Sequence, residues 1–101
     1  MSVQGQWKLL VNTPMGDQRF TAVLHDEDGI VTGTMTNDAN GLTAEVFDGH
    51  SSGDALEFKM NLKQMRMTLA FAVSVAGDEL EGKVKAGMFG KFKVRGERAA
   101  A

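Results

Sequence analysis

Apolar and polar residues alternate along most of this chain, in short runs separated by turns that contain glycine or aspartate. A period of two residues is typical of a β-strand with one buried face. The alternation predicts about eight strands, within residues 5–13, 19–25, 30–36, 42–47, 55–63, 67–75, 79–85 and 88–98. Residues 48–54 form the longest irregular stretch. Residues 62–70 are ambiguous, since a short helical turn is an alternative there.

The turns and the glycines within strands together predict a closed barrel. Asp28 followed by Gly29, between two alternating runs, is a strong hairpin signal. Glycine also recurs inside predicted strands, at Gly33, Gly82 and Gly96, where it marks a bend or a close backbone approach. Because the connections are short, consecutive strands should pair as neighbours. The fold class predicted is all-β, a single antiparallel up-and-down barrel of about eight short strands.

One face of the predicted strands is entirely apolar or glycine when Trp7 is taken as pointing inward. This face comprises Trp7, Leu9, Val11, Phe20, Ala22, Leu24, Val31, Gly33, Met35, Leu42, Ala44, Val46, Leu56, Phe58, Met60, Met67, Leu69, Phe71, Val73, Leu80, Gly82, Val84, Phe92, Val94 and Gly96. A one-residue bulge would reverse the assignment for the rest of a strand. No ionisable residue falls on this face, although acid–base catalysis inside the barrel would require one.

Length and charge narrow the functional classes. The 101 residues correspond to a single domain, residues 1–101, and we expect residues 99–101 to be a disordered tail. A formal net charge of -2 argues against non-specific nucleic-acid binding, which needs a basic surface. The chain has no cysteine and no apolar run near the ~20 residues of a membrane-spanning helix. Residues 1–5 lack the features of a signal peptide, so we expect a cytoplasmic protein.

The predicted interior favours binding of a small apolar molecule, without a cofactor or a metal ion. Methionine is flexible and polarizable, and is common at adaptable apolar binding surfaces, and the chain has 7 methionines. Filling of gaps in a small core is the other interpretation of these residues. The predicted ligand-binding residues are Trp7, Phe20, Met35, Phe58, Met60, Met67 and Phe71.

Two other functions are compatible with the pattern. One is a cofactor-free enzyme, such as an isomerase, cyclase or lyase acting on a hydrophobic metabolite, with polar groups at a barrel mouth transferring protons. Its candidate catalytic residues are His25, His50, Asp48 and Arg66. The other is a homodimeric structural or assembly module, since Leu10, Val23 and Phe47 point outward in the predicted strands and would form an interface if they cluster.

Several strand-and-turn segments resemble a known group of barrels. They are Gly5-Gln6-Trp7 at the start of the first strand and residues 13–16, 32–34, 48–49, 77–84 and 90–92. With these segments the chain is similar to small bacterial calycin-like modules, short relatives of lipocalins and fatty-acid-binding proteins. The resemblance implies a β-barrel and an apolar ligand. It implies no catalytic residue, because its motifs belong to strands and turns.

Overall fold

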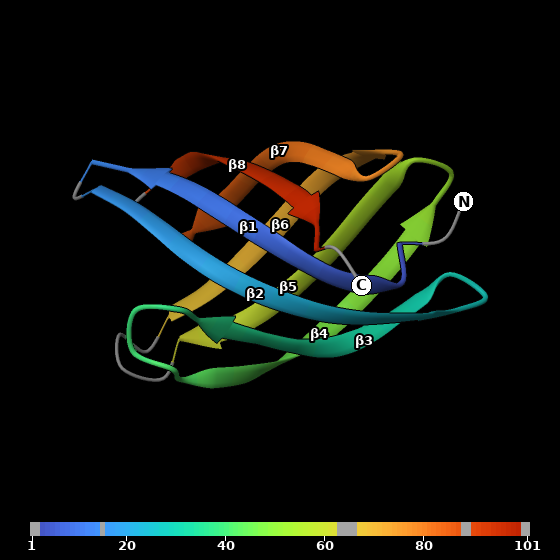
Figure 1. Ribbon diagram of the computed structural model, residues 1–101, viewed down its shortest axis with the longest axis horizontal. Helices are drawn as coiled ribbons and strands as arrows, with labels where there is room; N and C mark the ends of the chain where they lie inside the picture. The colour runs from blue at the N-terminus through green and yellow to red at the C-terminus, as the bar shows by residue number, and fades with distance from the viewer. Residues whose placement is uncertain (1–2, 15, 63–66, 88–89, 100–101) are drawn as a thin grey trace.

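The computed structural model describes residues 3–14, 16–62, 67–87 and 90–99. These residues form eight β-strands: β1 (Gly5–Thr13), β2 (Gly16–Glu27), β3 (Ile30–Asn37), β4 (Thr43–Ser52), β5 (Ala55–Leu62), β6 (Met67–Ala76), β7 (Glu79–Ala86) and β8 (Lys91–Arg98). Each strand pairs antiparallel with the next, and β8 pairs with β1 to close the barrel (Figure 1). The predicted all-β up-and-down barrel is confirmed.

The predicted inner face forms the core of the barrel. Side chains from every strand join one hydrophobic cluster, and no polar or charged side chain among the described residues is buried. Ala86 and Val3 also belong to this core, although the sequence pattern did not assign them to it. Leu42 was assigned to the inner face wrongly. It is 50% exposed, because it lies in the connection between β3 and β4, where the Asn40 side chain accepts a hydrogen bond from the Leu42 N–H.

Glycines inside strands let neighbouring strands approach as the sheet curls. A Cβ at Gly82 would collide with the carbonyl oxygen of Ala72 and lie 2.6 Å from the Cα of Val73. Gly33 has a φ of 148°, and a Cβ there would collide with the carbonyl group of Val23. Any side chain would force these strands apart, which explains why the residues are glycine.

The strand β4 differs most from the prediction. Residues 48–54 were expected to be irregular, but β4 continues through Asp48 and Gly49 to Ser52. The register shifts between Phe47 and His50, and Asp48 has a φ of 50°. An extra residue in one strand of a pair is a β-bulge. The bulge turns Phe47 and Asp48 outward in succession, while Gly49 is buried at an inner position.

Other boundaries differ by a few residues. β2 begins at Gly16 rather than residue 19, because Gly16 already pairs with Thr13 across the first hairpin. β8 begins at Lys91, and residues 88–89 of the predicted eighth strand lie outside the described residues. Residues 67–70 of the ambiguous segment are strand, and residue 63 of the predicted fifth strand is not described. The N–H of Ala99 donates to the carbonyl of Gln6 at 2.7 Å, and residues 100–101 of the predicted tail are also not described.

Candidate functional site: the interior and the ends of the barrel

The predicted ligand-binding residues come together inside the barrel. All except Met67 are at most 3% exposed, and Met67 is half-buried against the same cluster. Near the middle of the barrel, Phe58 on β5 lies opposite Phe71 on β6. Their rings stack with centroids 4.7 Å apart and planes 12° apart. The structure therefore unites these side chains in one apolar interior, which they occupy with their own atoms.

The barrel end that holds the chain termini is closed by residues from both extremes of the sequence. Val3 is buried, and its carbonyl accepts a hydrogen bond from the Trp7 Nε1–H at 2.9 Å. The Arg98 guanidinium carbon lies 4.3 Å from the centroid of the Trp7 ring. The same guanidinium donates to the Asp78 carboxylate at 2.9 Å and to the carbonyl of Gln4. Trp7 thus lies between the apolar core and a cation that holds the N-terminal segment in place.

Backbone hydrogen bonds join neighbouring turns around this closed end. The backbone N–H of Arg98 donates to the carbonyl of Asp78, at 2.7 Å. In the same way, the N–H of Val75 donates to the carbonyl of Asp54, and the N–H of Ser51 to the carbonyl of Gly29, both at 2.8 Å. The Asp26 side chain accepts from the Gly29 N–H and the Ser51 hydroxyl, both at 3.0 Å. The acidic turn after β2 is therefore structural, since its aspartate satisfies backbone and hydroxyl donors.

The opposite end of the barrel is bordered by apolar side chains that solvent reaches. Ala44, Met67 and Phe92 are half-buried and pack against the core from β4, β6 and β8. The exposed Leu42 precedes β4 at the same end. Of the four half-buried apolar residues that pack against the core in the described part of the chain, these three lie at this end and Val75 lies at the closed end.

Two predicted catalytic residues, Asp48 and His50, lie together on the outer wall rather than at a barrel mouth. They line a groove of about 1230 Å³ over β3–β8, with Phe47, Ala70 and Ala72 among its apolar residues. His50 Nε2 lies 2.8 Å from Glu57 Oε2, and Lys59 Nζ lies 3.7 Å from Asp48 Oδ2. These side chains are each 47–68% exposed. A proton transfer here would take place in contact with bulk water, whose high dielectric constant weakens electrostatic stabilisation of a transition state.

The remaining catalytic candidates do not join this pair. His25 is exposed on β2, where it pairs with Thr32 and does not line the groove. Arg66 lies outside the described residues. Among the described residues, no three histidine, aspartate or glutamate side chains are grouped as metal ligands would be. Nor does any helix in that part of the chain have the length and apolarity to span a bilayer.

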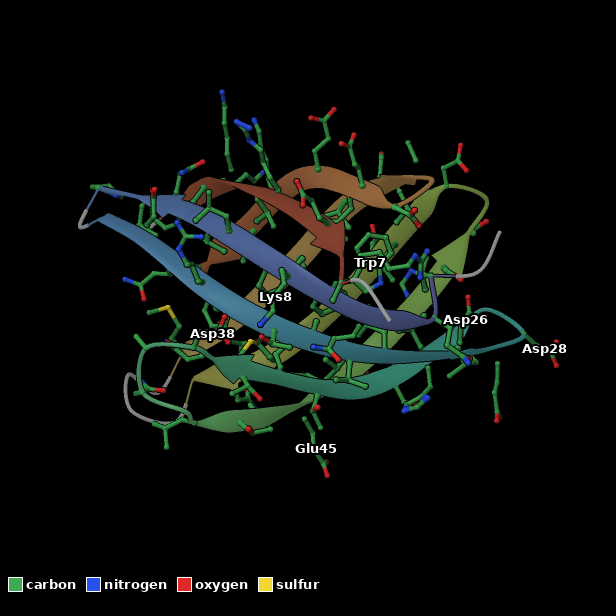
Figure 2. All side chains as sticks on the ribbon, in the orientation of Figure 1. Trp7, Lys8, Asp26, Asp28, Asp38 and Glu45 are labelled. Atoms are coloured by element: carbon green, nitrogen blue, oxygen red, sulfur yellow. The ribbon has the colours of Figure 1, made fainter. Side chains whose placement is uncertain are left out.

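The three residues of the predicted dimer face are separated on the outer wall. Leu10 lies between Arg19 and Arg95, and Val23 lies opposite Thr34. Phe47 is on the far side of β3, opposite Lys59. Elsewhere on this wall, Lys8 points toward Asp38 with the charged atoms 3.7 Å apart, whereas Glu45 points away from the barrel (Figure 2).

Arg98 and Val3 are the site residues that sequence reasoning missed. Arg98 is in phase with the inward-facing Val94 and Gly96 of β8, but the sequence analysis did not assign this charged residue to the inner face. Val3 lies before the first alternating run. The one signal in the sequence for this contact is the glycine two residues before Trp7. In the structure Gly5 has a φ of 137°, and a Cβ there would lie against the Arg98 side chain. That signal becomes specific only when β8 is known to lie beside β1.

Comparison of the chain with protein-family models, with curated proteins and with solved structures gave no match.

Proposed function

We propose that this protein is a calycin-like module that binds a small apolar molecule in the barrel interior, and that it does so without catalysis. The observation that carries the proposal is the contrast between a wholly apolar interior, closed at one end, and a second end bordered by half-buried Met67 and Phe92. Ligand sites are predominantly apolar and concave. The calycin-like assignment is supported by the closed eight-stranded meander and by Gly5-x-Trp7 at its start.

Entry of a ligand requires interior side chains to move. Met35 and Met60 are buried in this interior, and methionine changes conformation at little energetic penalty because its side chain is unbranched. Phe58 and Phe71 offer flat apolar faces to an incoming molecule. An apolar ligand would replace contacts between these side chains with contacts to itself, so the interior stays dry in both states.

The first test is native mass spectrometry of protein purified from its own host, followed by denaturing extraction. A co-purifying apolar metabolite is the expected result. In parallel, the apolar dye 1-aminoanthracene is titrated while the emission of Trp7, the single tryptophan, is followed. Saturable binding at one dye per barrel is expected. A protein that is empty from its host and also fails to bind the dye would overturn the proposal.

Two matched variants locate the entrance. Met67 and Val75 are half-buried residues near opposite ends of β6, and both pack against the core. Met67→Lys places a charge at the proposed entrance and should weaken dye binding at least tenfold. Val75→Lys, at the closed end, should leave the affinity within about twofold. Equal weakening by the two variants, with both folded by circular dichroism, would contradict entry at the Met67 end.

A further inference from the structure

The outer wall formed by β7 and β8 carries like charges directly opposite one another. Lys83 pairs with Lys93, and Lys85 pairs with Lys91. Directly opposed side chains in a sheet have Cβ atoms about 4.5–5.5 Å apart, and like charges at that distance are destabilising. All four lysines are exposed, and the described residues provide no carboxylate within 4 Å of their amino groups. This concentration of positive charge occurs in a chain whose net charge is -2.

The same two strands carry the opposite charge toward the other barrel end. Glu79 pairs with Glu97, and the next outward pair is Glu81 with Arg95. No ion pair within the described residues involves these three glutamates. Along the wall the pairs are therefore acidic with acidic, acidic with basic, and then two that are wholly basic. We call these four cross-strand pairs the charge ladder.

Most contacts between two charge ladders would join opposite charges. Two residues along a strand advance about 6.8 Å, so the four pairs extend over about 20 Å. A two-fold axis through the middle of the ladder places the first pair of one copy over the last pair of the other. Glu79 and Glu97 then face Lys85 and Lys91 of the second copy, and the reverse contact repeats the attraction. In the middle of the ladder, Glu81 faces Lys83, whereas Arg95 faces Lys93 as the one like-charge contact, so attractive contacts outnumber repulsive ones by three to one. A closed two-fold dimer uses one surface on both subunits, as this arrangement requires.

An apolar region continues from the basic part of the ladder. Lys85 lies beside Ala70, and Lys83 beside Ala72, on the neighbouring strand β6. Both alanines belong to the groove that extends to Phe47. A second copy seated on the ladder would cover part of this groove, adding burial of apolar surface to charge pairing.

We propose that this protein forms a two-fold homodimer through the charge ladder of β7 and β8. The dimer surface is distinct from the dispersed Leu10, Val23 and Phe47. It is also independent of ligand binding inside the barrel, because all ladder side chains point away from the interior. Association gives each of the three glutamates a lysine partner in the other copy, and it gives Lys83, Lys85 and Lys91 a carboxylate that they lack in the single chain.

The test combines charge reversal with mixing, read by sedimentation velocity at low ionic strength. One variant is Lys85→Glu with Lys91→Glu, and the other is Glu79→Lys with Glu97→Lys. Each alone faces like charge across the two-fold axis, so dimerisation should weaken at least tenfold. The equimolar mixture should dimerise again, because the end pairs of the ladder are then acidic in one chain and basic in the other. Raising the salt concentration should weaken the wild-type dimer.

Three results would overturn the proposal. They are a wild-type monomer at 100 µM, a dimer that neither reversal weakens, and a mixture that stays monomeric although both variants are folded. Glu27→Lys with Glu45→Lys changes the charge equally on exposed positions outside the ladder and should leave the dimer intact. If a reversal variant fails to fold, Lys85→Gln with Lys91→Gln serves instead. It removes the repulsion within the chain and should weaken the dimer while preserving the thermal midpoint.

Discussion

The two ends of this barrel are built from the same alternating strands but finish differently. At the end with the termini, Val3 and Trp7 are buried. The Arg98 guanidinium lies over the Trp7 ring and donates a hydrogen bond to the carbonyl of Gln4 in the N-terminal segment. At the other end, Met67 and Phe92 are only half-buried. The alternating pattern makes the wall of the barrel, whereas closure of an end depends on residues that lie far apart in the sequence.

The contrast separates stability from access. The closed end concentrates apolar burial, a cation on an aromatic ring and hydrogen bonds between adjacent turns. The other end keeps apolar side chains partly in contact with water, which stabilises the fold less. Substitutions at the closed end should therefore act mainly on the free energy of unfolding, and substitutions at the other end mainly on ligand binding.

Trp7→Ala is expected to have the largest effect on this comparison. Removing a fully buried aromatic side chain costs about 3–5 kcal/mol of unfolding free energy, and Trp7 is 0% exposed. The substitution also leaves Arg98 without the ring beneath it. Urea unfolding followed by circular dichroism measures the change. A loss below about 1 kcal/mol would mean that the closed end is not the stable one.

Arg98→Met should have the next largest effect. Methionine keeps an apolar side chain over Trp7 but removes the guanidinium that binds Asp78 and Gln4. Hydrogen bonds to charged groups typically contribute about 1.5–3 kcal/mol each. Because Arg98 is 25% exposed and solvent screens its interactions, we expect a loss of about 2 kcal/mol in total. Arg19→Met, on the exposed face of β2, is the control and should change stability by less than about 0.5 kcal/mol. Equal losses in the two variants would show that the position of Arg98 is unimportant.

Phe92→Ala, at the opposite end, is expected to be milder than Trp7→Ala. Phe92 is half-buried, so it should lose roughly half of the 3–5 kcal/mol typical of a buried phenylalanine, or about 2 kcal/mol. Thermal unfolding should show a clearly smaller shift in midpoint than Trp7→Ala. Dye affinity should change in Phe92→Ala if this end is the entrance. A shift as large as that of Trp7→Ala would remove the distinction between the two ends.

Asp78→Asn should have the smallest effect. The carboxylate is 82% exposed, and exposed ion pairs contribute about 0.2–1 kcal/mol. The asparagine oxygen still accepts a hydrogen bond from Arg98, so we expect a loss of about 0.5 kcal/mol that disappears at high salt. Measuring both proteins in low and high salt checks this. A loss of stability that is independent of salt would show that the charge of Asp78 is not what stabilises the fold.

The wall of the barrel was predictable because its signal is local. Alternation and the glycines at positions 33, 82 and 96 identified the strands. Of the residues that this pattern placed on the inner face, all but Leu42 lie there. Leu42 failed because alternation continued into the connection between β3 and β4. In β4, Asp48 and Gly49 have the composition of a hairpin turn, yet form a bulge because β3 and β5 continue to pair on both sides.

The closure and the outer surfaces were less predictable, because they arise between strands that are distant in sequence. Nothing near Arg98 in the sequence indicates that Trp7 lies beneath it. Similarly, Lys85 and Lys91 belong to two predicted strands, and their opposition requires the register of the hairpin. His50 pairs with Glu57 only because the bulge sets its direction. Local periodicity contains none of this information.

The seam between β1 and β8 has a consequence for the folding rate. Seven of the eight strand pairings join neighbours in sequence. The eighth joins residues 7–12 to residues 93–98, from Trp7 with Arg98 at one end to Asn12 with Lys93 at the other, so its partners are 81 to 91 positions apart. Closing so long a loop has a high entropic barrier, so we expect the seam to form last and to open first. Because Gln6 and Ala99 are hydrogen-bonded at one end of that seam, a short peptide linking the two termini would turn the slowest pairing into a local hairpin. A circular permutant opened at another turn should fold faster than the natural chain.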